Sequence, residues 1–342
     1  MIIYGSVTLS FKYSRERQDM KKYIIGIDIG GTKVASGIID TSGKLIKSVV
    51  LPTLAEKGRD TSMEQVFNSV DLLLSKSKVT RKNIKGIGVC APGPLDPIKG
   101  IVHNPPNLPG WKEVPLVDLL RKRFKFTVRL ENDGNAAGMA ETVWGAAKGF
   151  KYVFYVTVST GIGTGIIIDG KIYHGKNGMA GEGGHVTVNF DDKDAVCGCG
   201  NTGCIEAIAS GPHTVRRLKS KLGKPSRVKT KIIDLVDGDL DAITMRTIAE
   251  AAKKKDKLAL ETIKKQGEVL GIWLGSMINV IDPDIIVIGG GVSMIGELIF
   301  REIRKSAHRH TINIFASKTP IVQAKLKKNV GIYGAASVLM EK

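Results

Sequence analysis

The chain has 342 residues, 42% of them hydrophobic and 25% charged, which is the composition of an ordinary globular protein. Its length exceeds the range of about 250 to 300 residues in which one core usually suffices, so two domains are expected. A formal charge of +18 favours anionic ligands, but the basic residues are scattered, which indicates a solvated surface more than a nucleic-acid interface, and no apolar run approaches the ~20 residues of a membrane span.

Residues 1–19 differ from the rest of the chain. They lack the basic start, long apolar centre and cleavage site of a signal peptide. Met20 followed by Lys21 would be a natural beginning. We therefore interpret residues 1–19 as an extension that results from an upstream start, is an artefact or is a disordered tail, and assign them no function.

A glycine turn follows the first β-branched run, at residues 24–29. The turn is Gly30-Gly31-Thr32-Lys33, and a second such run continues to residue 39, which predicts a β-hairpin. Backbone amides in such a turn can approach an anion, Thr32 adds a donor, and Asp28 is placed to hold Mg²⁺ or its water. An ordinary tight hairpin has the same pattern, and the Walker type of phosphate loop is absent from the chain.

The same pattern recurs about 130 residues later. An apolar run at residues 152–159 precedes Thr160-Gly161-Ile162-Gly163-Thr164-Gly165 and a strand at residues 166–169. The recurrence indicates an internal duplication, whose two turns would hold a polyphosphate between two similar domains. A third turn, Gly289-Gly290-Gly291, follows a buried strand at residues 285–288, where the adenosine of a nucleotide could lie.

Between the first two turns, residues 61–77 are expected to form a helix capped by Asp60 or Thr61. A strand at residues 87–90 ends at Cys90, which its apolar neighbours indicate is a buried small side chain and not a nucleophile. Residues 91–111 contain six prolines and predict a rigid irregular loop. This loop is either a connector or the wall of a ligand site.

The strand expected at residues 126–130 ends at Glu131-Asn132-Asp133, before a helix that runs to about residue 147. An aspartate at a helix start is commonly a cap. A phosphoryl transferase, however, needs an aspartate that orients the acceptor hydroxyl and takes its proton. Both interpretations of Asp133 stay open, and Asn132 could bind the same substrate.

Three cysteines, Cys197, Cys199 and Cys204, fall within eight positions, and His185 precedes them. Three thiolates and an imidazole form the closed tetrahedral set of structural zinc, which we favour over a disulfide or three unligated thiols. Glu182 and Glu206 flank these ligands, and His185 has a second ring nitrogen that can face a substrate. The zinc would therefore hold polar groups in place and would not act as the catalyst.

The remaining elements are expected to be scaffold. A helix over residues 205–219 places Glu206 in its first turn, where capping is the alternative role. A long helix is expected at residues 258–281 and a short terminal helix at residues 333–340. The few cysteines suit a reducing cytoplasm.

Four motifs occur in an order that resembles the ROK family of sugar kinases and sugar-responsive repressors: Asp28-Ile-Gly-Gly-Thr-Lys33, Glu131-Asn-Asp133, Glu182-Gly-Gly-His185 and the cysteine motif through Glu206. The resemblance covers residue 21 to the C-terminus, and residues 104–115 resemble the bacterial glucokinase branch. It implies an α/β fold, the two-domain actin-like ATPase (ribonuclease H-like) fold, with a ligand cleft between the domains. The implied domains are residues 20–130 with 331–342, and residues 131–330 with the zinc loop.

The resemblance also implies a role for each matching residue. Asp133 would be the general base that removes the proton of the sugar 6-hydroxyl, and His185 would bind zinc through one nitrogen and sugar through the other. Gly134 stands where the family commonly has Ala, and the spacing from His185 to Cys197 is longer than in some members; neither difference removes a functional group. The expected sugar ligands are Gly93, Asn107, Asn132, Asp133, Glu182, His185 and Glu206. The expected ATP and Mg²⁺ site comprises Gly26, Asp28, Gly30, Gly31, Thr32, Lys33, Thr160, Gly161, Gly163, Thr164, Gly165, Gly289, Gly290 and Gly291. The expected zinc ligands are His185, Cys197, Cys199 and Cys204.

The function implied is that of an ATP-dependent hexose kinase, above all a glucokinase, acting in the cytoplasm as a dimer or tetramer. Kinases for N-acetylmannosamine, mannose, fructose or allose, and kinases that use polyphosphate, share most of these motifs. The alternative from another class is a sugar-sensing repressor. Such regulators carry a helix-turn-helix domain before the first phosphate loop, and the 27 residues that precede Asp28 are too few for one.

Overall fold

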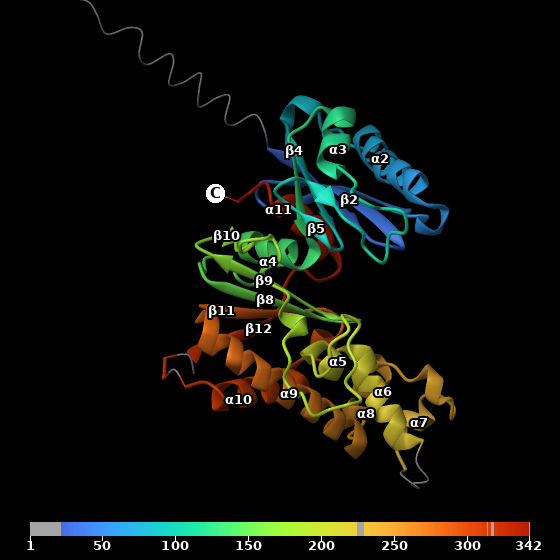
Figure 1. Ribbon diagram of the computed structural model, residues 1–342, viewed down its shortest axis with the longest axis vertical. Coiled ribbons are helices and arrows are strands. Elements are labelled where there is room, and N and C mark those ends of the chain that lie inside the picture. Colours follow the sequence, from blue (N-terminus) through green and yellow to red (C-terminus); the bar gives the residue numbers. More distant parts are fainter. Residues whose placement is uncertain (1–21, 224–228, 313, 316–317, 342) are drawn as a thin grey trace, which may run out of the picture. The chain divides into compact units, whose positions relative to one another are not determined.

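The computed structural model describes residues 22–223, 229–312, 314–315 and 318–341, so the expected extension at residues 1–19 lies outside the described residues. The chain divides into two compact units, Met1–Trp144 with Lys328–Lys342, and Gly145–Lys327. Each unit is built around a mixed sheet of five strands (Figure 1), which confirms the α/β class. The domain boundaries expected from the sequence stay a prediction.

The first unit has strands of two to eight residues and helices packed on both faces of its main sheet. Its elements are β1 (Tyr23–Ile29), β2 (Lys33–Asp40), β3 (Leu45–Pro52), η1 (Ala55–Lys57), α2 (Arg59–Lys76), η2 (Arg81–Asn83), β4 (Ile84–Ala91), β5 (Leu95–Asp96), β6 (Ile101–Val102), α3 (Leu116–Phe124), β7 (Val128–Asn132), α4 (Asp133–Trp144) and α11 (Val330–Ser337). The strand order is β3-β2-β1-β4-β7. β1, β2 and β3 pair antiparallel, whereas β1, β4 and β7 run parallel.

Alternate residues of β1 face opposite sides of this sheet, as the two-residue period of a strand requires. Ile25, Ile27 and Ile29 belong to the core shared with α2 and α3. Ile24, from the other face, packs in a separate cluster with residues of α11. A strand buried on both faces explains why the residues around Asp28 in this stretch are apolar on both sides of the sheet and do not alternate with polar ones.

Two glycines let α11 lie directly on the strands. A Cβ on Gly88 would lie 1.7 Å from the carbonyl oxygen of Ala335, and one on Gly26 would lie 2.2 Å from that of Ile332. Gly26 therefore has a packing role that the sequence did not reveal, and its expected nucleotide contact stays a prediction. The terminal helix begins three residues earlier than expected, at Val330.

The second unit repeats the strand order of the first. Its elements are β8 (Val153–Val158), β9 (Ile162–Ile168), β10 (Lys171–Ile172), η3 (Gly183–His185), α5 (Ile205–Ala209), α6 (Gly211–Leu222), α7 (Lys231–Asp234), η4 (Leu240–Ala242), α8 (Met245–Lys253), α9 (Lys257–Ile281), β11 (Ile285–Gly289), η5 (Val292–Ile295), α10 (Glu297–Arg309) and β12 (Ile321–Gln323). The order is β10-β9-β8-β11-β12, with β8, β9 and β10 antiparallel and β8, β11 and β12 parallel. This matches the first sheet strand for strand, which agrees with the internal duplication that the two glycine-turn hairpins indicated.

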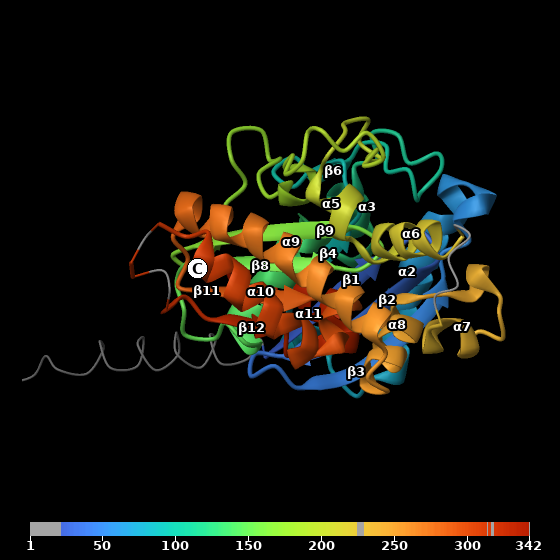
Figure 2. The same cartoon turned by 90° about the horizontal axis from the view of Figure 1, so that it is seen from below.

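Helices α9 and α10 run side by side in both views (Figure 1, Figure 2). Glycines at every fourth position of α9 make this approach possible: a Cβ on Gly271 would lie 2.6 Å from the oxygen of Ile303, and one on Gly275 would lie 2.8 Å from that of Ala307. The long helix expected at residues 258–281 is confirmed. No helix in the described part of the chain has the length and apolar character that crossing a bilayer requires.

Two helix predictions were wrong in detail. Helix α2 has Gly58 as its N-cap, with no side-chain cap bond, so neither Asp60 nor Thr61 caps it; Gly58 has φ 90°, and the turn before the helix uses this conformation. The helix expected at residues 205–219 is broken at Ser210 into α5 and α6. Pro212 lies in the first turn of α6, where a residue without an N–H is tolerated.

Two loop predictions also need correction. Strand β9 begins at Ile162, so Gly163, Thr164 and Gly165 lie in the strand and not in the turn. The proline-rich loop is mostly irregular but contains the two-stranded pair β5-β6.

Candidate functional site

In the first unit, three parallel strands place Asp28, Cys90 and Glu131 in one row across the sheet. The Cys90 thiol donates to Asp28 Oδ1 at 3.6 Å and approaches the carbonyl oxygen of Gly331 at 3.5 Å. Burial, followed by the charge of Asp28, raises the pKa of Cys90 well above its ordinary value. Cys90 is therefore a buried neutral thiol, as predicted.

Asp28 lies at the carboxyl end of β1, against the start of α11. A Cβ on Gly331 would lie 2.0 Å from Asp28 Oδ2, so the carboxylate fits only because residue 331 is glycine. Burial, and next the charge of Asp133, raise the pKa of Asp28, whereas Cys90 and Lys33 oppose this shift. A cation between two acids would offset their repulsion, so this pair has the chemistry of a Mg²⁺ site.

Asp133 begins α4, directly after the end of β7. The amide of Gly134 donates both to Asp133 Oδ1 at 2.8 Å and to Asn132 Oδ1 at 2.9 Å, so both side chains take part in capping. This bond does not exclude a base role, because a carboxylate has about four acceptor positions. Asp133 is exposed by surface area, yet the protein around its carboxylate desolvates it enough to raise its pKa, against the backbone amides that lower it.

Glu131 supports this turn and was not among the expected site residues. Its side chain is 3% exposed, and its Oε1 accepts from the amide of Asn132 at 3.0 Å and from Asn135 Nδ2 at 3.1 Å. The signal in the sequence was an acidic residue at the end of an apolar strand. A carboxylate that is buried there needs hydrogen-bond donors close by.

The first glycine turn is fastened by Thr53, which is fully buried and was also missed. Its hydroxyl donates to the carbonyl oxygen of Gly30 at 2.6 Å, and its amide donates to that of Thr32 at 3.0 Å. On the other side, a Cβ on Gly31 would lie 2.6 Å from the carbonyl oxygen of Asn107. The turn is therefore held between β3 and the proline-rich loop.

The proline-rich loop also approaches the end of β7. A Cβ on Gly93 would lie 3.6 Å from Asn132 Nδ2. Since Asn107 borders the glycine turn and Gly93 borders Asn132, the loop lines the expected site residues of this unit. This placement favours the ligand-wall interpretation over a simple connector.

In the second unit, His185, Cys197, Cys199 and Cys204 bring four ligand atoms within 4.8 Å of one another. Cys197 Sγ lies 3.5 Å from His185 Nδ1, and the sulfurs of Cys199 and Cys204 are 3.8 Å apart. Tetrahedral zinc, with bonds of about 2.3 Å to sulfur and about 2.0 Å to nitrogen, requires separations of about 3.8 Å between sulfurs and about 3.6 Å between sulfur and nitrogen. The cluster fits a zinc site.

The thiols themselves support a cation. All four cysteines of the chain are free thiols in this structure, which favours the zinc interpretation over the disulfide. Desolvation raises the pKa of Cys197 to about 12, whereas the backbone amide of Asn201 lowers the pKa of Cys199. Three neighbouring thiolates become compatible when a divalent ion shares their charge.

His185 and the two flanking glutamates connect this cluster to β9. The free nitrogen of His185, Nε2, lies 3.9 Å from Glu182 Oε2. Glu206 Oε2 accepts from the amide of Ile162 at 2.8 Å, and its Oε1 lies 3.7 Å from Cys197 Sγ. Both carboxylate oxygens of Glu206 thus have partners outside α5, which argues against the capping alternative.

The glycines before His185 allow this loop to pack on β9. A Cβ on Gly184 would lie 1.9 Å from the carbonyl oxygen of Ile162. The hydroxyl of Thr164 donates to the carbonyl of Gly181 and accepts from the amide of Gly183 at 3.1 Å. Thr164 is thus committed to holding the loop, and its expected phosphate contact stays a prediction.

The second and third glycine turns lie together at the ends of β8 and β11. A Cβ on Gly290 would lie 2.3 Å from the carbonyl oxygen of Val158, and one on Gly291 would lie 3.8 Å from Ser159 Oγ. Gly290 has φ 82°, a conformation that favours glycine. The two expected nucleotide loops of this unit are therefore neighbours.

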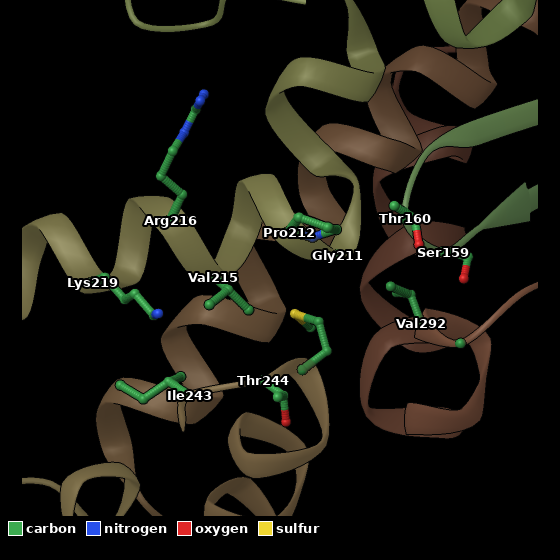
Figure 3. A pocket seen from close by; sticks show the side chains of 12 residues that line it. Ser159, Thr160, Gly211, Pro212, Val215, Arg216, Lys219, Ile243, Thr244 and Val292 are labelled. Atoms are coloured by element: carbon green, nitrogen blue, oxygen red, sulfur yellow. The ribbon is translucent and has the colours of Figure 1, made fainter. Parts of the chain in front are cut away.

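Beside these turns lies a pocket of about 560 Å³ (Figure 3). Thr160 and Gly291 border it on the side of the turns, and α6 and the start of α8 form the opposite side. Its apolar walls are Val215, Ile243, Met245 and Val292, and they were not predicted. Apolar residues on separate segments give no sequence signal that distinguishes them from ordinary core.

Residues 24–342 match the ROK family. The chain is 32% identical to the glucokinase of Thermotoga maritima over 322 residues, which is 94% of this chain and 98% of that protein. It is 30% identical to the xylose repressor of Caldicellulosiruptor bescii, over 93% of this chain and 78% of the repressor.

Among solved structures, the chain resembles a ROK glucokinase from Streptomyces griseus in complex with glucose and AMPPNP, with a TM-score of 0.77 and 32% identity over 94% of this chain and all of that one. The two mixed five-stranded sheets correspond to the actin-like ATPase fold of such structures, which confirms the expected fold.

Proposed function

The chain belongs to the ROK family, and on this premise we propose that it is an ATP-dependent hexose kinase that phosphorylates the 6-hydroxyl of glucose. The observation that carries the proposal is the resemblance, along nearly the whole chain, to glucokinases, one of them solved with glucose and a nucleotide. The acidic strand ends, the His/Cys₃ cluster and the pocket beside the glycine turns supply the groups that such a reaction needs.

In the proposed reaction, Asp133 accepts the proton of the sugar hydroxyl while the sugar oxygen bonds to the γ-phosphorus and the bond to ADP breaks. A raised pKa suits this role, because it brings the strength of the base closer to working pH. Such proton acceptance contributes about 10²- to 10⁴-fold in rate. Asn132, Gly93 and Asn107 would orient the sugar from the first unit.

The second unit would supply further sugar contacts through Glu182, His185 and Glu206. Zinc bound by His185 Nδ1 and the three thiolates would fix the imidazole, leaving Nε2 to face the sugar. Mg²⁺ near Asp28 would offset phosphate charge, assisted by backbone amides of the glycine turns. The pocket between these turns and α6 would take the adenosine. We also propose that the protein acts in the cytoplasm as a homo-oligomer.

The test is ADP release with Mg-ATP and zinc-loaded protein over glucose, mannose, fructose, N-acetylmannosamine and N-acetylglucosamine. We expect the highest kcat/KM with glucose. A clear preference for another sugar would replace the substrate while keeping the class. Lack of activity with ATP or polyphosphate, in protein that binds sugar, would refute the kinase proposal.

A sugar-responsive regulator is the second candidate, because xylose repressors match 93% of the chain at up to 30% identity. It predicts sugar binding, measured by calorimetry, without turnover. The acidic pair of Asp28 and Asp133 favours the kinase, since sensing alone has no need of a cation site or a base.

A further inference from the structure

Thr164 lies within β9, and only 3% of its surface is exposed. Its hydroxyl donates to the carbonyl oxygen of Gly181 and accepts from the amide of Gly183 at 3.1 Å. A hydroxyl has one proton to donate, and here Gly181 accepts it. A phosphate oxygen would compete for the same proton, so this arrangement indicates a role other than phosphate binding.

The two hydrogen bonds of Thr164 lie on either side of Glu182. Gly181 and Gly183 are the chain neighbours of Glu182, so one side chain fixes the backbone before and after this residue. Glu182 is also the N-cap residue of η3, where its carbonyl oxygen accepts from the amide of His185 at 3.0 Å. The backbone that carries Glu182 and His185 therefore depends on the Thr164 hydroxyl.

The side chain of Glu182 has little else to hold it in place. It is 56% exposed. Within the described residues, its carboxylate contacts His185 Nε2 at 3.9 Å, which is too long for a hydrogen bond. The backbone therefore sets the position of this carboxylate, whose oxygens can accept hydrogen bonds from the hydroxyls of a ligand.

The same stretch of β9 holds the other two expected sugar ligands of this unit. The amide of Ile162 donates to Glu206 Oε2 at 2.8 Å. Gly184, which precedes His185, packs on the Ile162 carbonyl oxygen, because a Cβ at this position would lie 1.9 Å from it. Both contacts use the backbone of Ile162, so Thr164 is the part of this support that a side-chain substitution can remove.

We propose that Thr164 is a positioning residue for sugar binding and that it acts through Glu182. Its hydroxyl holds the backbone on both sides of Glu182, and the Glu182 carboxylate accepts hydrogen bonds from the sugar. The identity of the ligand rests on the proposed function. This role assigns Thr164 to the sugar, whereas its place in the second glycine motif suggested the nucleotide.

The experiment compares variants of the zinc-loaded full-length protein by calorimetric titration with AMPPNP and, separately, with glucose or the hexose that the wild type prefers. Thr164→Val removes both bonds at nearly constant size and should weaken sugar binding at least about 10-fold, with AMPPNP affinity changed by no more than about 2-fold. Thr164→Ser keeps the hydroxyl and should hold sugar affinity within about 3-fold of the wild type. Thr262→Val is the matched control: it removes a hydroxyl that donates to the carbonyl oxygen of Leu258 at 2.7 Å in α9 of the same unit, and should change neither affinity.

A double-mutant cycle tests whether Thr164 acts through Glu182. In Glu182→Ala protein the carboxylate is already absent, so adding Thr164→Val should weaken sugar binding by no more than about 2-fold further. A loss of at least about 10-fold in both backgrounds would show that Thr164 affects sugar binding by another route, and would overturn the proposal.

Gly183→Ala is a second variant that leaves Thr164 unchanged, and it keeps the test open if Thr164→Val does not fold. A Cβ on Gly183 would lie 2.9 Å from Thr164 Oγ1, so it should push the turn away from the hydroxyl and weaken sugar binding at least about 5-fold. Unchanged sugar affinity in Thr164→Val and Gly183→Ala, or an equal loss of AMPPNP affinity, would overturn the proposal. These effects in a protein that binds sugar without turnover would refute the kinase proposal alone, and a wild type that binds no hexose would overturn both.

Discussion

In each sheet the central strand is the first strand of its unit, β1 or β8. Two antiparallel strands lie on one side of it, and two parallel strands lie on the other. At the last register position of the central parallel pair, the first unit has Asp28 beside Cys90, and the second has Thr157 beside Gly289. The first edge continues with Glu131 and Asp133, whereas the second edge continues with the hydroxyls of Ser159 and Thr160 and with glycines.

The two sheets thus share a strand order but place different chemical groups at the ends of their central strands. Burial, and next the charge of Asp133, raise the pKa of Asp28, and neighbouring carboxylates of this kind can bind a cation or accept a proton. Glycines instead allow a phosphate chain to approach the backbone amides closely, and hydroxyls add further donors. Neither group ionises, so phosphate binding leaves the protonation state of the site unchanged. On the proposed function, the first unit would therefore supply the chemistry and the second unit would hold the nucleotide.

The largest expected effect comes from breaking the acidic edge at its proposed base. Asp133→Asn keeps the side-chain size and an acceptor for the Gly134 amide but cannot take a proton, so kcat should fall at least about 10²-fold while glucose binding persists. Steady-state kinetics and calorimetry measure both. Thr157→Val, at the other edge, is the matched isosteric change and should alter kcat only a few-fold; near-normal turnover in Asp133→Asn would remove Asp133 from the base role.

The next effect concerns the metal loop that only the second unit carries among the described residues. Cys199 is exposed, unlike Cys197 and Cys204, so Cys199→Ser disturbs little packing and reports on the metal. We expect about one zinc per chain in the wild type, its loss in the variant, and at least about 10-fold weaker sugar binding. Metal analysis and calorimetry test this, with Asn201→Ser in the same loop as control. A metal-free variant with full sugar affinity would contradict the prediction.

A smaller effect is expected where the glycine turn contacts Glu206. A Cβ at Gly161 would lie 2.5 Å from Glu206 Oε2, so Gly161→Ala should displace this carboxylate from the Ile162 amide. At Gly163 the nearest atom to a Cβ is Thr157 Cγ2, at 3.2 Å. We therefore expect KM for the sugar to rise about 10-fold in Gly161→Ala and no more than about 2-fold in Gly163→Ala. Equal effects would show that Glu206 does not depend on the turn.

Local patterns predicted the features that depend on neighbours in the chain. The two hairpins follow from β-branched runs around glycines, and the metal cluster follows from four ligands at short spacing. Gly26 shows the limit of such reasoning. It sits in a motif that suggests phosphate binding, yet its close contact is with Ile332, more than 300 residues away.

The same limit applies to the break between α5 and α6. A proline is tolerated in the first turn of a helix, so Pro212 could not show from sequence that a new helix begins there. The break matters for function because α6 forms a wall of the pocket, and residues of this wall, such as Val215, resemble ordinary core positions. The helix break and the pocket wall both depend on contacts between segments that are distant in the chain, so the spacing of residues within one segment does not predict them.

The smallest expected effect is a change in Tm, which tests whether the charge at the acidic edge of the first sheet destabilises the fold. Burial and Asp133 raise the pKa of Asp28, so above this pKa the ionised carboxylate destabilises the fold, and below the unfolded value of 3.8 the penalty vanishes. Asp28→Asn should therefore raise Tm by about 2 °C at pH 7 and leave it unchanged near pH 3.5.

Asp40 provides a control with the opposite sign. Burial acts to raise the pKa of Asp40, but hydrogen bonds from Ser42 and Lys44 lower it overall. The ionised carboxylate therefore stabilises the fold, and Asp40→Asn should lower Tm at pH 7. Calorimetric scans at both pH values provide the measurement. A lower Tm for Asp28→Asn at pH 7 would mean that the acidic edge is not strained, and the contrast with the uncharged edge of the second unit would then lie in chemistry alone.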